Sequence, residues 1–117
     1  MSTDILNKKG YTVVKVNSER LDTCTAPDLK ADLVVLSNKG EKNILLDLNS
    51  CKYCDSSGLR AILVGNRLCE DNIGTFILFG LQPDVEFLIK ISMLHTVLLI
   101  AKTEEEAENL LLKKQEL

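Results

Sequence analysis

The sequence predicts an α/β fold, formed as a single domain over residues 1–117, with a mixed central β-sheet of about four to five strands and about four helices. Short apolar or β-branched runs alternate along the chain with segments whose apolar residues recur at helical spacing. The order is strand, strand, helix, then strand and helix three times, which requires crossover helices between parallel strands. Hydrophobic residues make up 45% of the 117 residues, which is enough for one substantial core.

The chain begins with two expected strands and a helix. A short strand near Asp4–Asn7 turns at Lys9-Gly10 into the β-branched run Tyr11–Val16. The first helix is expected from Pro27 to about Asn38, because proline suits a first helical turn and Thr25 is a good N-cap residue. Its expected inward residues are Ala26, Leu29, Leu33 and Leu36.

The middle of the chain supplies the central strand and the second helix. The apolar run Asn43–Leu48 is expected to be the buried central strand. The second helix is expected from about Ser57 to Glu70, and Thr75–Phe79, bounded by glycines, is the next strand. The expected inward residues of the second helix are Leu59, Ile62, Leu63 and Cys69.

The last part of the chain repeats the alternation. Pro83 opens a third helix that runs to about Ile91, and Thr96–Ile100 is expected to be the final strand. Thr103 and Glu106 have the spacing of a capping box at the start of the last helix. The expected inward residues of these two helices are Val85, Leu88, Ile91, Ala107, Leu110 and Leu111.

Charge and hydropathy exclude several classes of function. A net charge of −3 and a pI near 5.1 argue against direct nucleic-acid binding, which needs a basic face. No apolar run approaches the roughly 20 residues that cross a bilayer, so no membrane insertion is expected. The N-terminal segment lacks the apolar core of a secretory signal, and the expected location is the cytoplasm.

The four cysteines suggest packing more than chemistry. Cys51 and Cys54 form a C-x-x-C pair, which leaves a redox or metal-binding module as one interpretation. In a thioredoxin-like site the first cysteine would begin the helix, and here the pair precedes it. A closed zinc site needs four ligands, and the sequence has neither a second such pair nor a histidine pair. We therefore expect buried thiols, with no metal and no cofactor.

The segment Asp55-Ser56-Ser57-Gly58-Leu59 places two hydroxyls and a carboxylate where the second helix begins. The free amides and the positive dipole end of a helix N-terminus favour a negative group. Each serine can cap the helix, help to hold an anion or accept a phosphate. We favour Ser57 as the cap, because this leaves Ser56 more accessible. No catalytic residue is expected, since the one histidine, His95, is distant in sequence.

Two loops that lead from strands into helices are candidates for a functional edge. They are Glu19–Thr25 and Asn49–Ser57, which precede the first and second helices. In α/β sheets, loops at the carboxyl ends of strands tend to form the functional edge. Sequence alone leaves open whether the two loops are adjacent.

The run Leu46–Leu59, which reads L-D-L-N-S-C-K-Y-C-D-S-S-G-L, resembles the signature of STAS domains. The upstream run Leu21–Ala26 resembles the L-D-x-x-T-A of that family, and the segment Phe79–Leu98 has a similar length and pattern. The resemblance extends over nearly the whole chain, and it is strongest to anti-sigma factor antagonists.

The resemblance implies a protein-interaction switch that regulates transcription through a sigma factor. In it Ser56 would be phosphorylated by a partner serine kinase that is also the anti-sigma factor. The unphosphorylated domain would bind that kinase and free the sigma factor. The residues implied at the partner-binding edge are Asp22, Thr25, Asp55, Ser56, Ser57 and Gly58.

Three positions depart from the family pattern. Glu19 and Met93 replace residues that are often glycine, and Arg60 replaces a residue that is often small. These bulkier residues keep a second interpretation open, a constitutive STAS subunit of a stress-signalling particle or a lipid-transport complex, with no phosphorylation switch. The sequence does not give the oligomeric state.

Overall fold

The computed structural model describes residues 3–115, and its centre is a five-stranded sheet of order β1-β2-β4-β6-β7. β1 is antiparallel to β2, and the other neighbouring strands are parallel. The predicted α/β architecture with a mixed sheet is therefore confirmed. The sheet strands are β1 (Thr3–Lys8), β2 (Tyr11–Val16), β4 (Asn43–Asp47), β6 (Thr75–Phe79) and β7 (Leu99–Ala101).

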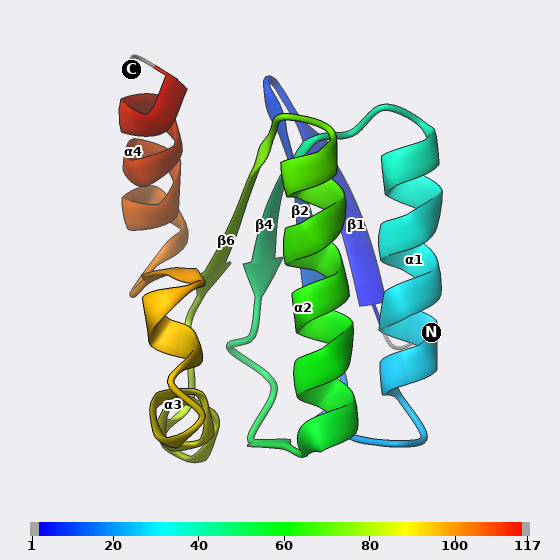
Figure 1. Ribbon diagram of the computed structural model, residues 1–117, viewed down its shortest axis with the longest axis vertical. Coiled ribbons are helices and arrows are strands. Elements are labelled where there is room, and N and C mark those ends of the chain that lie inside the picture. Colours follow the sequence, from blue (N-terminus) through cyan, green and yellow to red (C-terminus); the bar gives the residue numbers. More distant parts are fainter. Residues whose placement is uncertain (1–2, 116–117) are drawn as a thin grey trace.

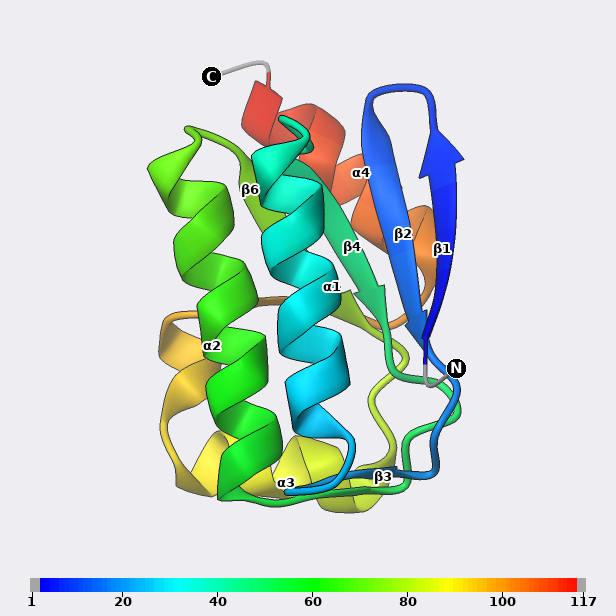
Figure 2. The same ribbon diagram turned by 90° about the vertical axis from the view of Figure 1, so that its right-hand side faces the viewer.

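The helices cover both faces of this sheet. α1 and α2 lie side by side on one face, whereas α4 lies on the other (Figures 1 and 2). α3 lies at the end of the molecule where β2 and β4 end (Figure 2). The helices are α1 (Ala26–Asn38), α2 (Ser56–Asp71), α3 (Pro83–Ile91) and α4 (Glu104–Gln115), with a short 3-10 helix at Leu94–Thr96. No helix in this part of the chain is long and apolar enough to cross a membrane.

Alternation along the central strands divides the core into two layers. In β4, Ile44 and Leu46 pack into the cluster under α1 and α2, whereas Leu45 packs into the cluster under α4. All three side chains are at most 1% exposed, because a strand points successive side chains to opposite faces. A continuous apolar run thus becomes a strand buried on both faces, as the sequence predicted.

The final strand and one inward residue differ from the prediction. Thr96–Ile100 was expected to be a strand, but only Leu99–Ala101 pairs with β6. Met93 takes a left-handed conformation with φ of 61° and precedes the 3-10 helix Leu94–Thr96. Part of the expected strand therefore lies in this helix, and the strand starts later. Ile91 was expected to face inward, yet it is 60% exposed. Ile89 occupies the inward face of α3 instead.

Ile73 ends α2 in a conformation that a β-branched residue rarely adopts. Its φ is 59°, and its side chain is 89% exposed. The amide of Ile73 donates to the Glu70 carbonyl, and the amide of Gly74 donates to the Cys69 carbonyl. These two bonds form a Schellman motif, in which the left-handed residue is usually glycine.

The substitution Ile73→Gly is expected to stabilise the protein by about 1 kcal/mol. The left-handed conformation costs an L-residue about 1–2 kcal/mol, and glycine avoids that cost but loses more chain entropy. Urea unfolding of the two proteins measures the difference. Ile73→Ala is the matched control, because alanine removes the side chain and keeps the strain. Equal stabilities of the glycine and alanine variants would refute the prediction.

Candidate functional site

A two-stranded parallel ribbon brings the two candidate loops together. It pairs β3 (Arg20–Leu21) with β5 (Tyr53–Cys54), outside the main sheet. The Glu19 carbonyl accepts hydrogen bonds from the amides of Lys52 and Tyr53, at 2.7 and 3.0 Å. The two segments run side by side below α1 and α2 (Figure 2). The loops therefore share one edge of the molecule, a question that the sequence left open.

Asp55, and not a serine, caps α2. Its backbone is extended, and its Oδ1 accepts hydrogen bonds from the amides of Ser57 at 2.9 Å and Gly58 at 3.1 Å. The prediction that Ser57 is the cap is thus wrong. The carboxylate thus accepts hydrogen bonds from two of the helix N-terminal amides that were expected to be free to bind an anion. Any second anion at this helix end would lie close to a carboxylate that is already in place.

The two serines lie in different environments. Ser56 is the first residue of α2 and is exposed. Within residues 3–115 its hydroxyl has no hydrogen-bond partner. Ser57 is half-buried and lines a groove between α1 and α2. Of the two hydroxyls, that of Ser56 is the more accessible to a modifying enzyme.

Gly58 lies where α2 meets the ribbon. A Cβ at this position would stand 2.3 Å from the Leu21 carbonyl oxygen and 2.6 Å from the Cys54 sulfur. The same Leu21 oxygen accepts a hydrogen bond from the Asp55 amide at 3.2 Å. Glycine is therefore required by the close approach of β3 to the first turn of the helix.

Asp22 holds the loop that leads into α1. Its Oδ1 accepts hydrogen bonds from the amides of Cys24 at 3.0 Å and Thr25 at 3.3 Å, and its Oδ2 lies 3.4 Å from Arg20 Nε. The backbone hydrogen bond from Cys24 is the main cause that lowers the pKa of this carboxyl. Asp22 thus fixes the conformation of the loop between β3 and α1 by accepting hydrogen bonds from that loop's own amides.

Thr25 occupies the N-cap position of α1 as predicted, but its hydroxyl does not cap the helix. The hydroxyl donates to the Arg20 carbonyl at 2.7 Å and accepts from the Asp22 amide at 2.9 Å. It joins the start of α1 to the ribbon. The partner-binding residues implied by the resemblance therefore lie on one connected edge of the molecule, with Gly58 buried beneath it.

The outer surface of the ribbon carries Arg20, Tyr53 and Lys52, which were not singled out from the sequence, together with Glu19. The Arg20 guanidinium lies 4.3 Å above the ring centre of Tyr53, which is 40% exposed. Beside them, the exposed side chains of Glu19 and Lys52 form an ion pair at 3.5 Å. The sequence signal that could have drawn attention to this surface is Tyr53, one of only two tyrosines in the chain, three residues before Ser56.

Three of the four cysteines lie in the core. Cys51, Cys54 and Cys69 are buried in the cluster under α1 and α2, whereas Cys24 is exposed, contrary to expectation. Burial raises the pKa of Cys54 and of Cys69 to about 12. The thiol of Cys51 donates to the Tyr53 carbonyl at 3.2 Å, and all four cysteines are free thiols. The side chains of the C-x-x-C pair, Cys51 and Cys54, are therefore part of the apolar core beside the ribbon.

We expect one thiol to react rapidly in the folded protein at pH 8, and this should be Cys24. Burial raises the pKa of Cys51, Cys54 and Cys69, which lowers their thiolate fraction at that pH, and it also blocks access of the reagent. Titration with a chromophoric disulfide should show one fast thiol in buffer and four in denaturant. Cys24→Ser should abolish the fast phase. A fast phase that survives in this variant would contradict the prediction.

Comparison with known proteins agrees with the fold and the motif. The model of the STAS domain family matches residues 2–107. BtrV of Bordetella bronchiseptica, named as an anti-sigma factor antagonist, is 30% identical over 87 residues, which are 74% of this chain and 75% of that protein.

Two solved structures show the same fold. An anti-sigma factor antagonist from Mycobacterium paratuberculosis has a TM-score of 0.84 at 20% identity, covering 93% of this chain and 92% of its own. The phosphorylated form of the Bacillus cell fate determinant SpoIIAA has a TM-score of 0.70 at 23% identity, covering 92% of this chain and 96% of its own.

Proposed function

The chain belongs to the STAS domain family and is anti-sigma factor antagonist-like, and from this premise we propose that it is a cytoplasmic interaction switch controlled by phosphorylation of Ser56. A partner serine kinase, which is also the anti-sigma factor, would bind the edge formed by the ribbon and the start of α2. Binding of the unphosphorylated form would release the sigma factor. Phosphorylation would end that binding.

The observation that supports this proposal is the position of the Ser56 hydroxyl. It is exposed at the first residue of α2, and the cap beside it is already made by Asp55. A phosphate adds about −1.5 to −2 charges and three acceptor oxygens. Because Asp55 occupies the amides of Ser57 and Gly58, these amides are not free to neutralise the added charge. The phosphate would therefore project a large negative charge from the docking edge.

Two named relatives support the same function. BtrV is named as an anti-sigma factor antagonist, and SpoIIAA has been determined in unphosphorylated and phosphorylated forms. The phosphorylated SpoIIAA structure supports the proposal that a domain of this fold can carry the modification.

The experiment compares wild type with Ser56→Ala, Ser56→Asp and Ser57→Asp as baits in the native host. A kinase-like ATPase should be captured by wild type and by Ser56→Ala, and its recovery with Ser56→Asp should fall at least ten-fold. Purified with ATP, that ATPase should phosphorylate the wild-type protein and not Ser56→Ala, as read by mass spectrometry. Ser57→Asp adds the same charge one residue away and should retain more binding.

Equal capture of one partner by all four baits, with no phosphate on Ser56, would overturn the switch. That result would identify the chain as a constitutive subunit of a larger assembly.

A further inference from the structure

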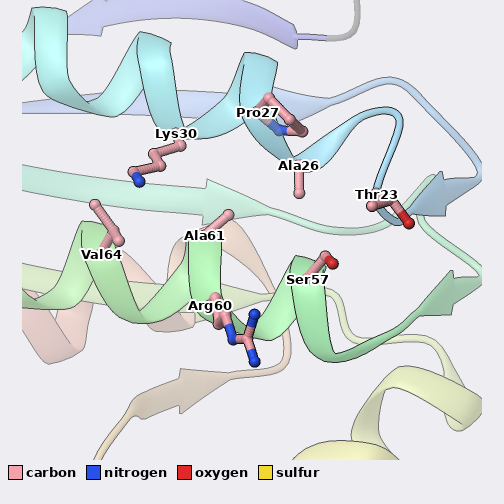
Figure 3. Close-up of a pocket in the computed structure, with 8 residues that line it drawn as sticks. All are labelled: Thr23, Ala26, Pro27, Lys30, Ser57, Arg60, Ala61 and Val64. Atoms are coloured by element: carbon pink, nitrogen blue, oxygen red, sulfur yellow. The ribbon is translucent and has the colours of Figure 1, made fainter.

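A groove of about 270 Å³ runs between the first halves of α1 and α2 (Figure 3). Its apolar lining consists of Ala26 and Pro27 from α1 and Ala61 and Val64 from α2. Both alanines are buried, and their small side chains leave the space open. The groove begins beside Ser57 and is therefore continuous with the edge proposed to bind the partner.

Two cations flank this apolar lining. Lys30 is the fifth residue of α1 and Arg60 the fifth of α2, and both are exposed. In Figure 3 the Lys30 side chain extends from α1 into the space beside α2, and the Arg60 guanidinium leans toward the first turn of α2. Within residues 3–115 neither forms an ion pair. Both positive charges are thus available to a ligand.

The hollow continues along α2. A second hollow of about 730 Å³ shares Lys30, Arg60 and Val64 with the first, and its lining also includes Arg67, Glu70 and Asp71. The two together form a trough along the α1–α2 pair, in which the charged residues at the end near Ser57 are cations alone and those at the far end are one arginine and two carboxylates. α2 has 16 residues, so the trough is limited to roughly 24 Å.

We propose that this trough docks an amphipathic helix of the protein partner, oriented with its carboxylates over Lys30 and Arg60. The apolar lining would receive the aliphatic face of such a helix. A carboxylate would form charge-assisted hydrogen bonds with the Arg60 guanidinium. The charged residues at the end near Ser57 are cations alone, whereas carboxylates appear only at the far end, and this difference favours one direction of the bound helix over the reverse.

This inference deepens the proposed function, on which it rests for the class of partner, and it assigns a specificity role to Arg60. Specificity requires a group that attracts one partner and disfavours others. A partner with a basic helix would place like charges against Lys30 and Arg60.

The test selects binders from a library of random helical peptides displayed on phage. Wild-type protein should enrich peptides with a carboxylate beside aliphatic residues. The selected peptides should bind the double variant Lys30→Glu/Arg60→Glu at least ten-fold more weakly. The fold should tolerate both changes, because both side chains are exposed and glutamate is a good helix former. The matched control, Lys8→Glu/Lys9→Glu, makes the same change of charge at the end of β1 and in the turn that follows, and should leave binding unchanged.

Two further readouts decide the outcome. Amide chemical shifts of labelled protein should move at Lys30, Arg60 and Val64 when the best peptide is added. Inorganic phosphate is the second probe, and it should bind at least ten-fold more weakly than the peptide. No acidic enrichment, equal binding to the double variant, or phosphate binding as tight as the peptide would overturn the docking inference. None of these readouts uses Ser56 or a kinase, so failure here is distinguishable from failure of the phosphorylation switch.

Discussion

Gly58→Ala is expected to lower the free energy of unfolding by about 2 kcal/mol and to disturb the candidate edge. The new methyl group would stand 2.3 Å from the Leu21 carbonyl oxygen, a backbone atom held by the Asp55 amide. Overpacking of this kind costs about 1–3 kcal/mol or more, and the higher helix propensity of alanine returns only about 1 kcal/mol. Urea unfolding measures the net change.

Ser57→Ala is the control for Gly58→Ala. It introduces alanine one residue earlier in the same helical turn, and the Asp55 cap uses only the backbone amide of residue 57. Its effect on stability should stay within about 0.5 kcal/mol. If Gly58→Ala is as stable as this control, the close approach of β3 to α2 is not what requires glycine.

Leu21→Ala is expected to have the largest effect, a loss of about 3 kcal/mol, and to loosen the ribbon selectively. The Leu21 side chain is 1% exposed and anchors β3 in the core under α2. Truncating a buried leucine to alanine costs about 2–5 kcal/mol. Because the ribbon has two residues in each strand, loss of this anchor should release the amides of Lys52 and Tyr53. Hydrogen exchange should show both amides losing protection.

Leu45→Ala separates the two effects of the Leu21 change. Leu45 is fully buried on the opposite layer, under α4, so its truncation should cost a similar free energy. The ribbon amides should then exchange no faster than global unfolding allows. Equal loosening of the ribbon in both variants would show that Leu21 has no special role at this edge.

The main strands and helices could be predicted well from the sequence because the hydrophobic pattern that specifies each one lies within its own residues. β4 is a continuous apolar run and α1 has apolar residues at regular helical spacing, and both patterns directly reflect which faces are buried. The ribbon could not be predicted in this way. β3 and β5 have two residues each, too few for any periodicity, and the bonds of Glu19 with Lys52 and Tyr53 cross more than 30 residues.

The helix cap was mispredicted for a related reason. Asp55, Ser56 and Ser57 are all good N-cap residues, so the local sequence does not choose among them. The choice is made by the ribbon, because the bond from the Asp55 amide to the Leu21 carbonyl holds residue 55 in the extended conformation that a cap requires. Long-range structure thus decided a local feature. The buried role of Gly58 was hidden in the same way, since its neighbour Leu21 is distant in sequence.

The ribbon also fixes when the candidate edge can exist during synthesis and folding. Its two strands enclose α1 and β4 in the chain, so the loop between them closes only after that intervening segment has compacted. A chain still emerging from the ribosome, with residues before Tyr53 exposed and the rest inside, has a complete α1 segment and no edge. The candidate edge therefore cannot form until β5 and the start of α2 have left the ribosome. A chain truncated before Tyr53 would lack this edge, although it contains all of α1 and β4.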